Sequence, residues 1–284
     1  MGLKTSLESR IKPLVPKNLR SSVLNLYCLM LDGVALIRGR RDALTPPKRL
    51  LRFATDPNSD FGETGRGFVD FLVRQCGLRP DHKVLDVGCG VGRVAVALAG
   101  HLEQEGRYEG FDIVPQEIEW CQKHISTRFP NFSFQLADVR NLTYNPTGKV
   151  RASEYRFPYE DGSFDFVVLA SVFTHMLSRD MDRYVTEVSR VLKHGGRCFV
   201  SFYLLNDKAR KNIGAGISAF DFRNTVDGCC VQTADNPESA VAYEEDRVRE
   251  LFGRCQLLVE AVFYGTWSSR KEQVQDIIVA SRIV

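Results

Sequence analysis

A glycine-dense turn is the first feature of this sequence that could do chemistry. The turn, Gly88-Cys89-Gly90-Val91-Gly92, follows an apolar segment that ends in Asp86 and Val87. Glycine lacks a Cβ atom, so such a turn can adopt positive φ angles and lay its backbone against a ligand. Arg93 stands where the dinucleotide fingerprint G-x-G-x-x-G has its third glycine. Because Asp86 would also repel a pyrophosphate, we expect a ligand that carries positive charge or hydrogen-bond donors.

Two further aspartates follow the next two predicted strands. Asp112 comes about twenty residues after the glycine turn, where a carboxylate can accept hydrogen bonds from both hydroxyls of a ribose. Asp138 follows a strand over 132–136 and is placed to accept the exocyclic amine of an adenine. The alternatives are a surface aspartate at a strand end and a turn-forming aspartate. S-adenosylmethionine, which has a sulfonium, a ribose and no phosphate, fits this set.

His175 is the candidate general base, because its imidazole titrates near neutral pH. It follows a predicted strand over 163–169, at the edge of the sheet where a reacting group would lie. The alternative is a histidine that caps or packs the following helix. Phe61, Tyr264 and Trp267 are candidates for the aromatic walls of an acceptor pocket, and packing in the core or in the lid is the alternative for each.

Predicted strands and helices alternate through the middle of the chain, which is typical of a parallel sheet covered on both faces. The last two predicted strands have only a short connection between them and are expected to be antiparallel neighbours. We therefore predict an α/β fold with a doubly wound, mostly parallel seven-stranded sheet and a final antiparallel strand. The strands are expected at 83–87, 108–111, 132–136, 163–169, 197–202, 256–264 and 274–283, and the helices at 64–77, 91–102, 115–128, 180–192 and 244–252.

Two segments fall outside this alternation. Residues 1–60 are expected to form an N-terminal helical appendage or lid, and residues 61–284 the ligand-binding domain. Within that domain, 206–239 shows little periodicity and is predicted to be a lid insertion. An apolar run over 23–37 has arginines on both sides, so peripheral membrane contact through residues 19–41 is one interpretation. A helix that packs over the ligand-binding domain explains the same residues and is favoured.

Composition limits the classes of partner. The formal net charge is +3 and no block of lysine and arginine occurs, so nucleic acid is not expected as a partner. The eight cysteines show no metal-ligand spacing, so we expect no metal site, reduced thiols and a cytoplasmic location. The sequence leaves the oligomeric state open.

Taken together, the motifs resemble those of the class I S-adenosylmethionine-dependent methyltransferases, and the closest subgroup acts on small molecules. The resemblance covers residues 64 to 203 and rests on segments 84–93, 110–112, 135–139, 157–167 and 187–196. It implies that S-adenosylmethionine is the cofactor. The cofactor-binding residues that it implies are Asp86, Gly88, Cys89, Gly90, Gly92, Arg93, Asp112, Ile113, Ala137, Asp138, Val139 and Ala170.

The resemblance predicts methyl transfer to a small-molecule acceptor, at an oxygen of a sugar, a phenolic or polyketide compound, or a lipid-linked metabolite. No D/N-P-P-Y/F/W segment follows the strand over 163–169, so amine methylation of bases or glutamines has no support. The alternatives are carbon or nitrogen methylation on the same fold, a nicotinamide-dependent oxidoreductase, and a cofactor-binding protein without catalysis. The glycine spacing and Asp86 disfavour the oxidoreductase.

Overall fold

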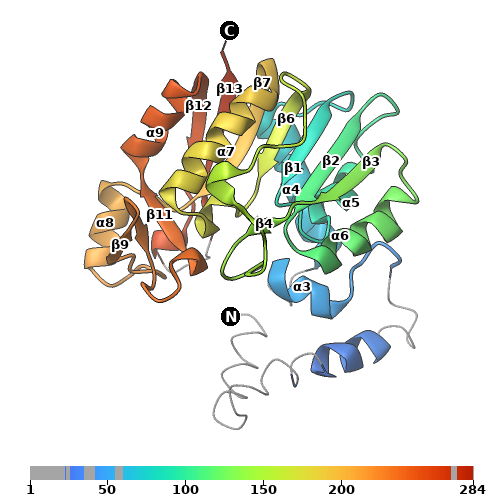
Figure 1. The fold of residues 1–284 in the computed structure, drawn as a ribbon, viewed down its shortest axis with the longest axis horizontal. Coiled ribbons are helices and arrows are strands. Elements are labelled where there is room, and N and C mark those ends of the chain that lie inside the picture. Colours follow the sequence, from blue (N-terminus) through green and yellow to red (C-terminus); the bar gives the residue numbers. More distant parts are fainter. Residues whose placement is uncertain (1–22, 24–25, 35–41, 55–59, 270–273, 284) are drawn as a thin grey trace.

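The computed structural model describes residues 23, 26–34, 42–54, 60–269 and 274–283. Its centre is a seven-stranded sheet in the order β12-β13-β7-β6-β1-β2-β3, shown in Figure 1. Only β13 is antiparallel to its neighbours, so the predicted fold class is confirmed. The strands are β1 (Lys83–Val87), β2 (Arg107–Asp112), β3 (Phe132–Leu136), β6 (Phe164–Leu169), β7 (Leu192–Phe202), β12 (Leu257–Phe263) and β13 (Asp276–Arg282).

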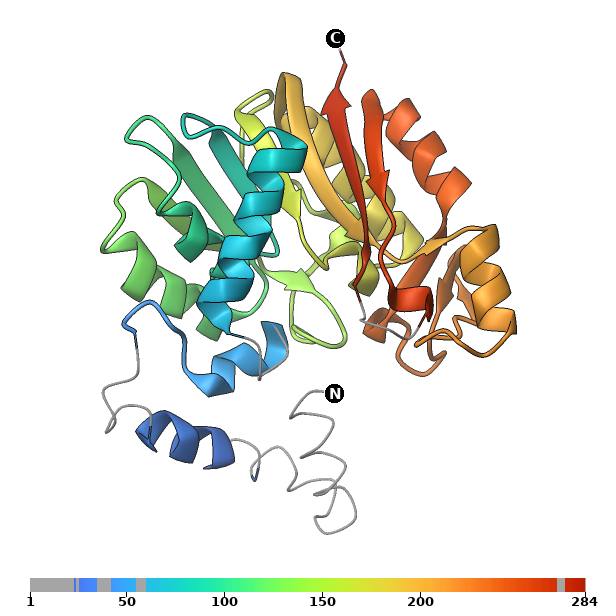
Figure 2. The same ribbon diagram turned by 180° about the vertical axis from the view of Figure 1, so that it is seen from behind.

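Helices cover both faces of the sheet because alternate strand residues point to opposite sides. On one face, Leu85 and Val167 pack against α7 (Ser178–Val191) and α9 (Glu245–Arg254). On the other, Val84 and Phe166 pack against a second group of helices, seen in front of the sheet in Figure 2. That second group consists of α4 (Phe61–Cys76), α5 (Arg93–Leu98) and α6 (Pro115–Cys121).

The segment predicted to be a lid folds into regular structure. It contains α8 (Asp207–Gly214) and a short helix, η4 (Pro237–Ser239), and contributes two strands to a small second sheet. Tyr203, Phe222 and Trp267 form part of a separate buried cluster there. The order of this second sheet is β8-β11-β10-β9, with β8 (Leu204–Leu205), β9 (Asn224–Val226), β10 (Cys229–Val231) and β11 (Val241–Glu244).

Several predicted element boundaries were wrong. The helix expected over 180–192 ends at Val191, and β7 begins at Leu192 rather than after a turn at 193–196. The helix expected over 91–102 is the shorter α5, and the one expected over 115–128 is α6 followed by a π-helical turn, η1 (Gln122–Ser126). The sequence also did not predict the elements of the 206–239 segment, or a pair of short parallel strands, β4 (Val139–Arg140) and β5 (Val150–Arg151).

The described part of the N-terminal appendage is a helix over 26–34 and α3 (Lys48–Ala54). Asp32 connects the two, since its Oδ1 accepts a hydrogen bond from the backbone N–H of Lys48 at 2.8 Å. Leu26, Leu29 and Met30 are each more than half exposed, so this apolar face has no cover within the described residues. Residues 1–22, 24–25, 35–41 and 55–59 of the appendage lie outside the described residues. None of the described helices is both long and apolar enough to cross a bilayer.

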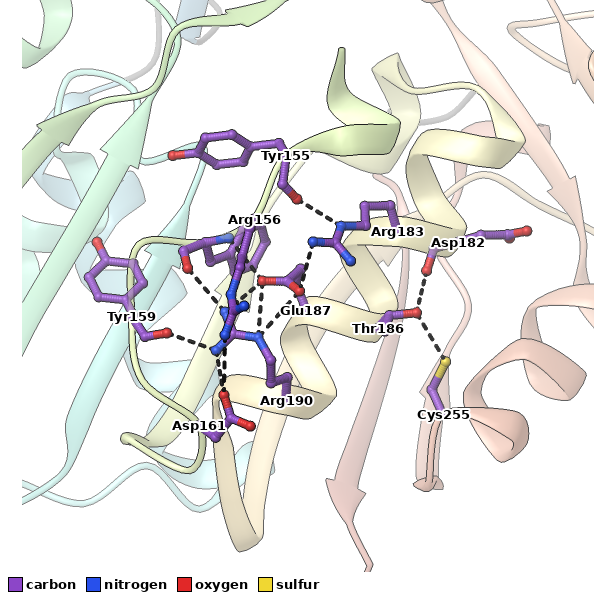
Figure 3. Close-up of polar contacts among 11 residues, drawn as sticks. Tyr155, Arg156, Tyr159, Asp161, Asp182, Arg183, Thr186, Glu187, Arg190 and Cys255 are labelled. Carbon is purple, nitrogen blue, oxygen red and sulfur yellow. Dashed lines mark hydrogen bonds and ion pairs between the residues drawn. The ribbon is translucent and has the colours of Figure 1, made fainter. Parts of the chain in front are cut away.

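One of the motifs behind the resemblance has a structural role, drawn in Figure 3. Glu187 on α7 is 2% exposed, and its Oε2 accepts from the backbone N–H of Phe157 at 2.9 Å and from Arg190 at 2.6 Å. Arg190 also donates to the carbonyl of Tyr159 and to the carboxylate of Asp161, both at 2.7 Å. Because each buried charge has a partner, this network fixes the loop before β6 against α7.

Candidate functional site

A cavity of about 390 Å³ opens at the carboxyl ends of β1, β2 and β6. Ligands of open parallel sheets bind at this edge. The cavity is lined by every residue that the sequence predicted for cofactor binding or as the base, except Gly92, Ala137 and Asp138. The predicted residues that line it are Asp86, Gly88, Cys89, Gly90, Arg93, Asp112, Ile113, Val139, Ala170 and His175.

The glycine turn needs its glycines at two positions. Gly88 has φ of +74°, and a Cβ there would lie 2.7 Å from Cγ2 of Val172. Gly92 has φ of +72° and precedes α5, although it does not line the cavity. The backbone N–H groups of Gly88 and Cys89 both donate to the carbonyl of Phe111, which ties the turn to β2. A larger residue at either glycine would be strained and would displace the turn from the cavity wall.

Asp112 lies at the end of β2 with its carboxylate held by two backbone donors. Oδ2 accepts from the N–H of Gly90 at 2.9 Å, and Oδ1 accepts from the N–H of Val114 at 3.0 Å. Burial raises the pKa of this carboxyl from its usual value, and the backbone donors oppose that rise. Each oxygen keeps a free lone pair, so Asp112 can accept two more hydrogen bonds from a ligand in the cavity.

Asp86 carries less charge than the sequence predicted. It is 2% exposed, and its Oδ2 accepts from the hydroxyl of Tyr108 at 2.6 Å. Burial raises the pKa of Asp86 to about 7, a rise that Asp112 reinforces while Tyr108 and Arg93 oppose it. The carboxyl is therefore partly protonated at neutral pH, and a bound cation would shift it toward the carboxylate.

The two residues predicted to contact an adenine do not line the cavity. Ala137 is 1% exposed and packed in the core. Asp138 points to solvent, where its Oδ1 accepts from the backbone N–H of Lys149 at 3.2 Å and its Oδ2 lies 3.8 Å from Nζ of the same lysine. The neighbouring Val139 does line the cavity. An adenine contact through Asp138 stays a prediction, while these bonds are those of a turn-forming aspartate.

His175 also lines the cavity and lies between two loops. Its Nδ1 is 2.9 Å from the carbonyl oxygen of Glu238 in η4, and its Nε2 is 3.4 Å from the hydroxyl of Tyr144. Since a carbonyl oxygen can only accept, Nδ1 carries the proton and Nε2 keeps its lone pair. Burial lowers the pKa of His175, so the ring is neutral at pH 7. A neutral imidazole whose Nε2 carries no proton is able to accept one.

The predicted aromatic walls were wrong, since none of the three residues lines the cavity. Phe61 begins α4 and is buried in the core on that face. Trp267 is buried in the separate cluster that it forms with Tyr203 and Phe222, and its Nε1–H donates to Asp276 at 2.7 Å. Tyr264 is 57% exposed, and its hydroxyl donates to Glu245. The aromatic side chains that do line the cavity are Phe111, Tyr144 and Tyr184.

Several polar residues of the cavity were missed by the sequence reasoning, among them Glu117, Tyr144, Asp180 and Glu238. Tyr144 and Glu238 lie in long connections, far in sequence from the glycine turn and without a motif. Asp180 is the third residue of α7, and Glu117 is the third residue of α6. An acidic residue in the first turn of a helix is common, because it complements the helix dipole. That signal therefore did not distinguish either residue from a surface carboxylate.

This donor set fits S-adenosylmethionine. Asp112 offers two free acceptor sites for a ribose, and Glu117 lies beside it with Oε1 unpartnered among the described residues. Asp86, together with the glycine turn, would face the cationic amino-acid part of the cofactor. Within the described residues no lysine lines the cavity, and its two arginines, Arg93 and Arg140, are outnumbered by five carboxyl side chains, so a pyrophosphate would meet mostly acidic groups.

The comparisons with known proteins agree with this geometry. A family model described as a methyltransferase domain matches residues 85–200. The chain is 30% identical over 150 residues to the methyltransferase GfsG of Streptomyces halstedii, covering 51% of this chain and 47% of the relative. It is 28% identical over 152 residues to the O-methyltransferase cnsE of Penicillium expansum, covering 51% and 48%. The chain thus spans about half the length of the curated relatives it matches.

Solved structures share the fold. A SAM-dependent methyltransferase from Methanosarcina mazei aligns with a TM-score of 0.50 at 21% identity, covering 73% of this chain and 95% of that one. The matched segment runs from β1 into β7 and contains the glycine turn, Asp112 and His175. Residues 85–200 therefore match a methyltransferase domain, the chain has the fold of S-adenosylmethionine-dependent methyltransferases, and S-adenosylmethionine is the cofactor that these similarities support.

Proposed function

We propose that this chain transfers the methyl group of S-adenosylmethionine to an oxygen atom of a small hydroxylated acceptor, with His175 as the general base. The observation that carries the proposal is the tautomer of His175, since the Glu238 carbonyl holds the proton on Nδ1 and leaves Nε2 free. When bound, S-adenosylmethionine supplies an activated methyl group on a sulfonium sulfur. The protein then has to orient the acceptor, exclude water and remove one proton.

Nε2 of His175 would accept the hydroxyl proton of the acceptor. The methyl carbon would exchange its bond to sulfur for a bond to the acceptor oxygen, and S-adenosylhomocysteine would be the leaving group. Tyr144 lies edge-on to the imidazole, with ring centroids 5.3 Å apart, and its hydroxyl is 3.4 Å from Nε2. That long contact keeps the ring oriented, and an acceptor hydroxyl can replace it. The Glu238 carbonyl stabilises the imidazolium that forms, because it continues to accept from Nδ1.

The acceptor half of the cavity favours a compound with several hydroxyl groups. Asp180 and Glu238 both line it, and they are close enough for Asp180 to raise the pKa of Glu238. Carboxyl oxygens accept hydrogen bonds from hydroxyl groups, whereas an apolar phenol would leave them unpaired at a cost of about 1–3 kcal/mol. A sugar-like acceptor therefore suits these walls better than a planar aromatic one.

The experiment measures S-adenosylhomocysteine released from S-adenosylmethionine with a panel of hexoses and deoxyhexoses, simple phenols and isoprenoid alcohols. Mass spectrometry of the product identifies the methylated atom. With the best acceptor, His175→Ala is expected to lower kcat by about 10²–10⁴-fold and to abolish the acidic limb of the pH–rate profile. Binding of S-adenosylhomocysteine should change little, because His175 faces the acceptor half.

Two results would count against the proposal. A product methylated at carbon or nitrogen would show that the acceptor atom is not oxygen. Full activity of His175→Ala with an unchanged pH profile would leave the histidine a structural role, namely to hold η4 and the Tyr144 loop. Thermal unfolding of the variant separates a catalytic role of His175 from a structural one, since a structural role alone lowers Tm without changing the pH profile.

A further inference from the structure

Glu117 is a buried carboxyl in the cofactor half of the cavity that the sequence motifs do not account for. It is 3% exposed, it lies in the first turn of α6 and it lines the cavity. Its Oε1 has no hydrogen-bond partner among the described residues. A buried polar atom without a partner costs free energy, about 1–3 kcal/mol, so its retention at a ligand cavity points to a ligand group.

The neighbours of Glu117 show which part of the cavity it faces. Burial raises the pKa of its carboxyl to about 8, and the nearby Asp112 raises it further. Glu117 and Asp112 both raise the pKa of Tyr144, so Glu117 lies within electrostatic range of both residues. At neutral pH Glu117 is mostly protonated and can donate one hydrogen bond as well as accept one.

Hydrogen-bond matching then identifies the ligand group. Asp112 has free acceptor sites and no proton to offer, so it takes the protons of the ribose hydroxyls. Each hydroxyl oxygen can accept a bond as well, and the cavity needs a donor beside Asp112 to satisfy it. Glu117 is the side chain near Asp112 that carries such a donor.

We propose that Glu117 is a further cofactor-binding residue, whose carboxyl group hydrogen-bonds a ribose hydroxyl of S-adenosylmethionine beside Asp112. This inference rests on the proposed function in one respect, that the full chain binds the cofactor in this cavity. It goes beyond it by assigning a residue to the ribose that no motif of the sequence indicated.

The test is calorimetric titration of the full chain with S-adenosylhomocysteine. We expect Glu117→Leu to raise Kd by about 5- to 50-fold, which is the loss of one buried hydrogen bond. Glu117→Gln should stay within about threefold of the unmodified chain, because a neutral amide also donates and accepts. The matched control is Glu119→Leu, the same change on the exposed face of the same helix, and its Kd should not change.

Ribose analogues separate a direct contact from an indirect effect. The 2′-deoxy and 3′-deoxy forms of S-adenosylhomocysteine each lack one ribose hydroxyl. The form that lacks the hydroxyl bonded by Glu117 should bind Glu117→Leu and the unmodified chain equally well. If Glu117→Leu weakens all three ligands by the same factor, or weakens none, the inference is overturned. If the unmodified chain binds no S-adenosylhomocysteine, the proposed function itself fails. Thermal unfolding checks each variant, and Glu117→Ala replaces Glu117→Leu if the leucine variant does not fold.

Discussion

Removal of the Asp112 carboxylate tests the cofactor site most directly. Asp112→Ala deletes the two acceptor oxygens that face the cavity and also the partners of the Gly90 and Val114 N–H groups. Two hydrogen bonds to a charged acceptor contribute about 2–4 kcal/mol to binding. Since 1.4 kcal/mol is a factor of ten, Kd for S-adenosylhomocysteine should rise by about 30- to 700-fold.

Asp112→Ala also changes the stability of the unbound chain, through two opposing effects. Because burial raises the pKa of Asp112, the unbound protein already loses free energy by keeping this carboxylate charged, and the alanine variant escapes that cost. The two orphaned N–H groups act in the other direction and should lower the free energy of unfolding by about 1–3 kcal/mol. Thermal unfolding should therefore show a lower Tm for Asp112→Ala than for the unmodified chain.

Calorimetric titration of the full chain with S-adenosylhomocysteine measures the effect, with Glu119→Ala as the control. Glu119 is an exposed acidic residue on α6 that does not line the cavity. We expect its replacement to change Kd by less than about threefold, consistent with a surface position. Unchanged affinity in Asp112→Ala, or an equal loss in Glu119→Ala, would refute the placement of the ribose at the end of β2.

Three further outcomes are expected. Tyr144→Phe should lower kcat by less than about tenfold, because its contact with Nε2 is long; a loss as large as that of His175→Ala would make Tyr144 a catalytic residue. Folding raises the pKa of Glu117 from 4.5 to about 8, so wild-type stability falls as pH rises across that window. The Tm of Glu117→Gln relative to the unmodified chain should therefore be higher at pH 8 than at pH 5, and a pH-independent difference would contradict this. We also propose that the exposed apolar face of helix 26–34 binds lipid, so the chain should sediment with anionic vesicles and Leu26→Ser/Met30→Ser should not; equal sedimentation of both would count against it.

The sheet and the cofactor edge were predictable from the sequence because local signals specify them. The glycine turn, the alternation of strands and helices, and the acidic residue at the end of β2 each lie within a short stretch of chain. Parallel strands bring their carboxyl ends to one edge, so Asp86, Asp112 and His175 had to lie near each other. The final antiparallel pair followed from the short connection between β12 and β13.

The acceptor half was not predictable because its residues come from segments without periodicity. The carbonyl that sets the tautomer of His175 belongs to Glu238, which is separated from it by 63 positions. A backbone carbonyl has no sequence signature, since every residue has one. Trp267 misled the prediction for a related reason: an aromatic residue is as suitable for a second core as for a pocket wall, and the small β8-β11-β10-β9 sheet needed a core.

The insertion over 206–239 connects acceptor choice to the base. Its η4 places the Glu238 side chain in the acceptor half of the cavity and the Glu238 carbonyl on Nδ1 of His175. The Glu238 carboxylate also accepts from the backbone N–H of Leu142, in the loop that carries Tyr144. Any change in this segment that admits a different acceptor therefore also moves the group that holds the proton on Nδ1. Substitutions at Glu238 should consequently alter KM through the side chain alone, whereas deletions in η4 should lower kcat as well, because only deletions displace the carbonyl.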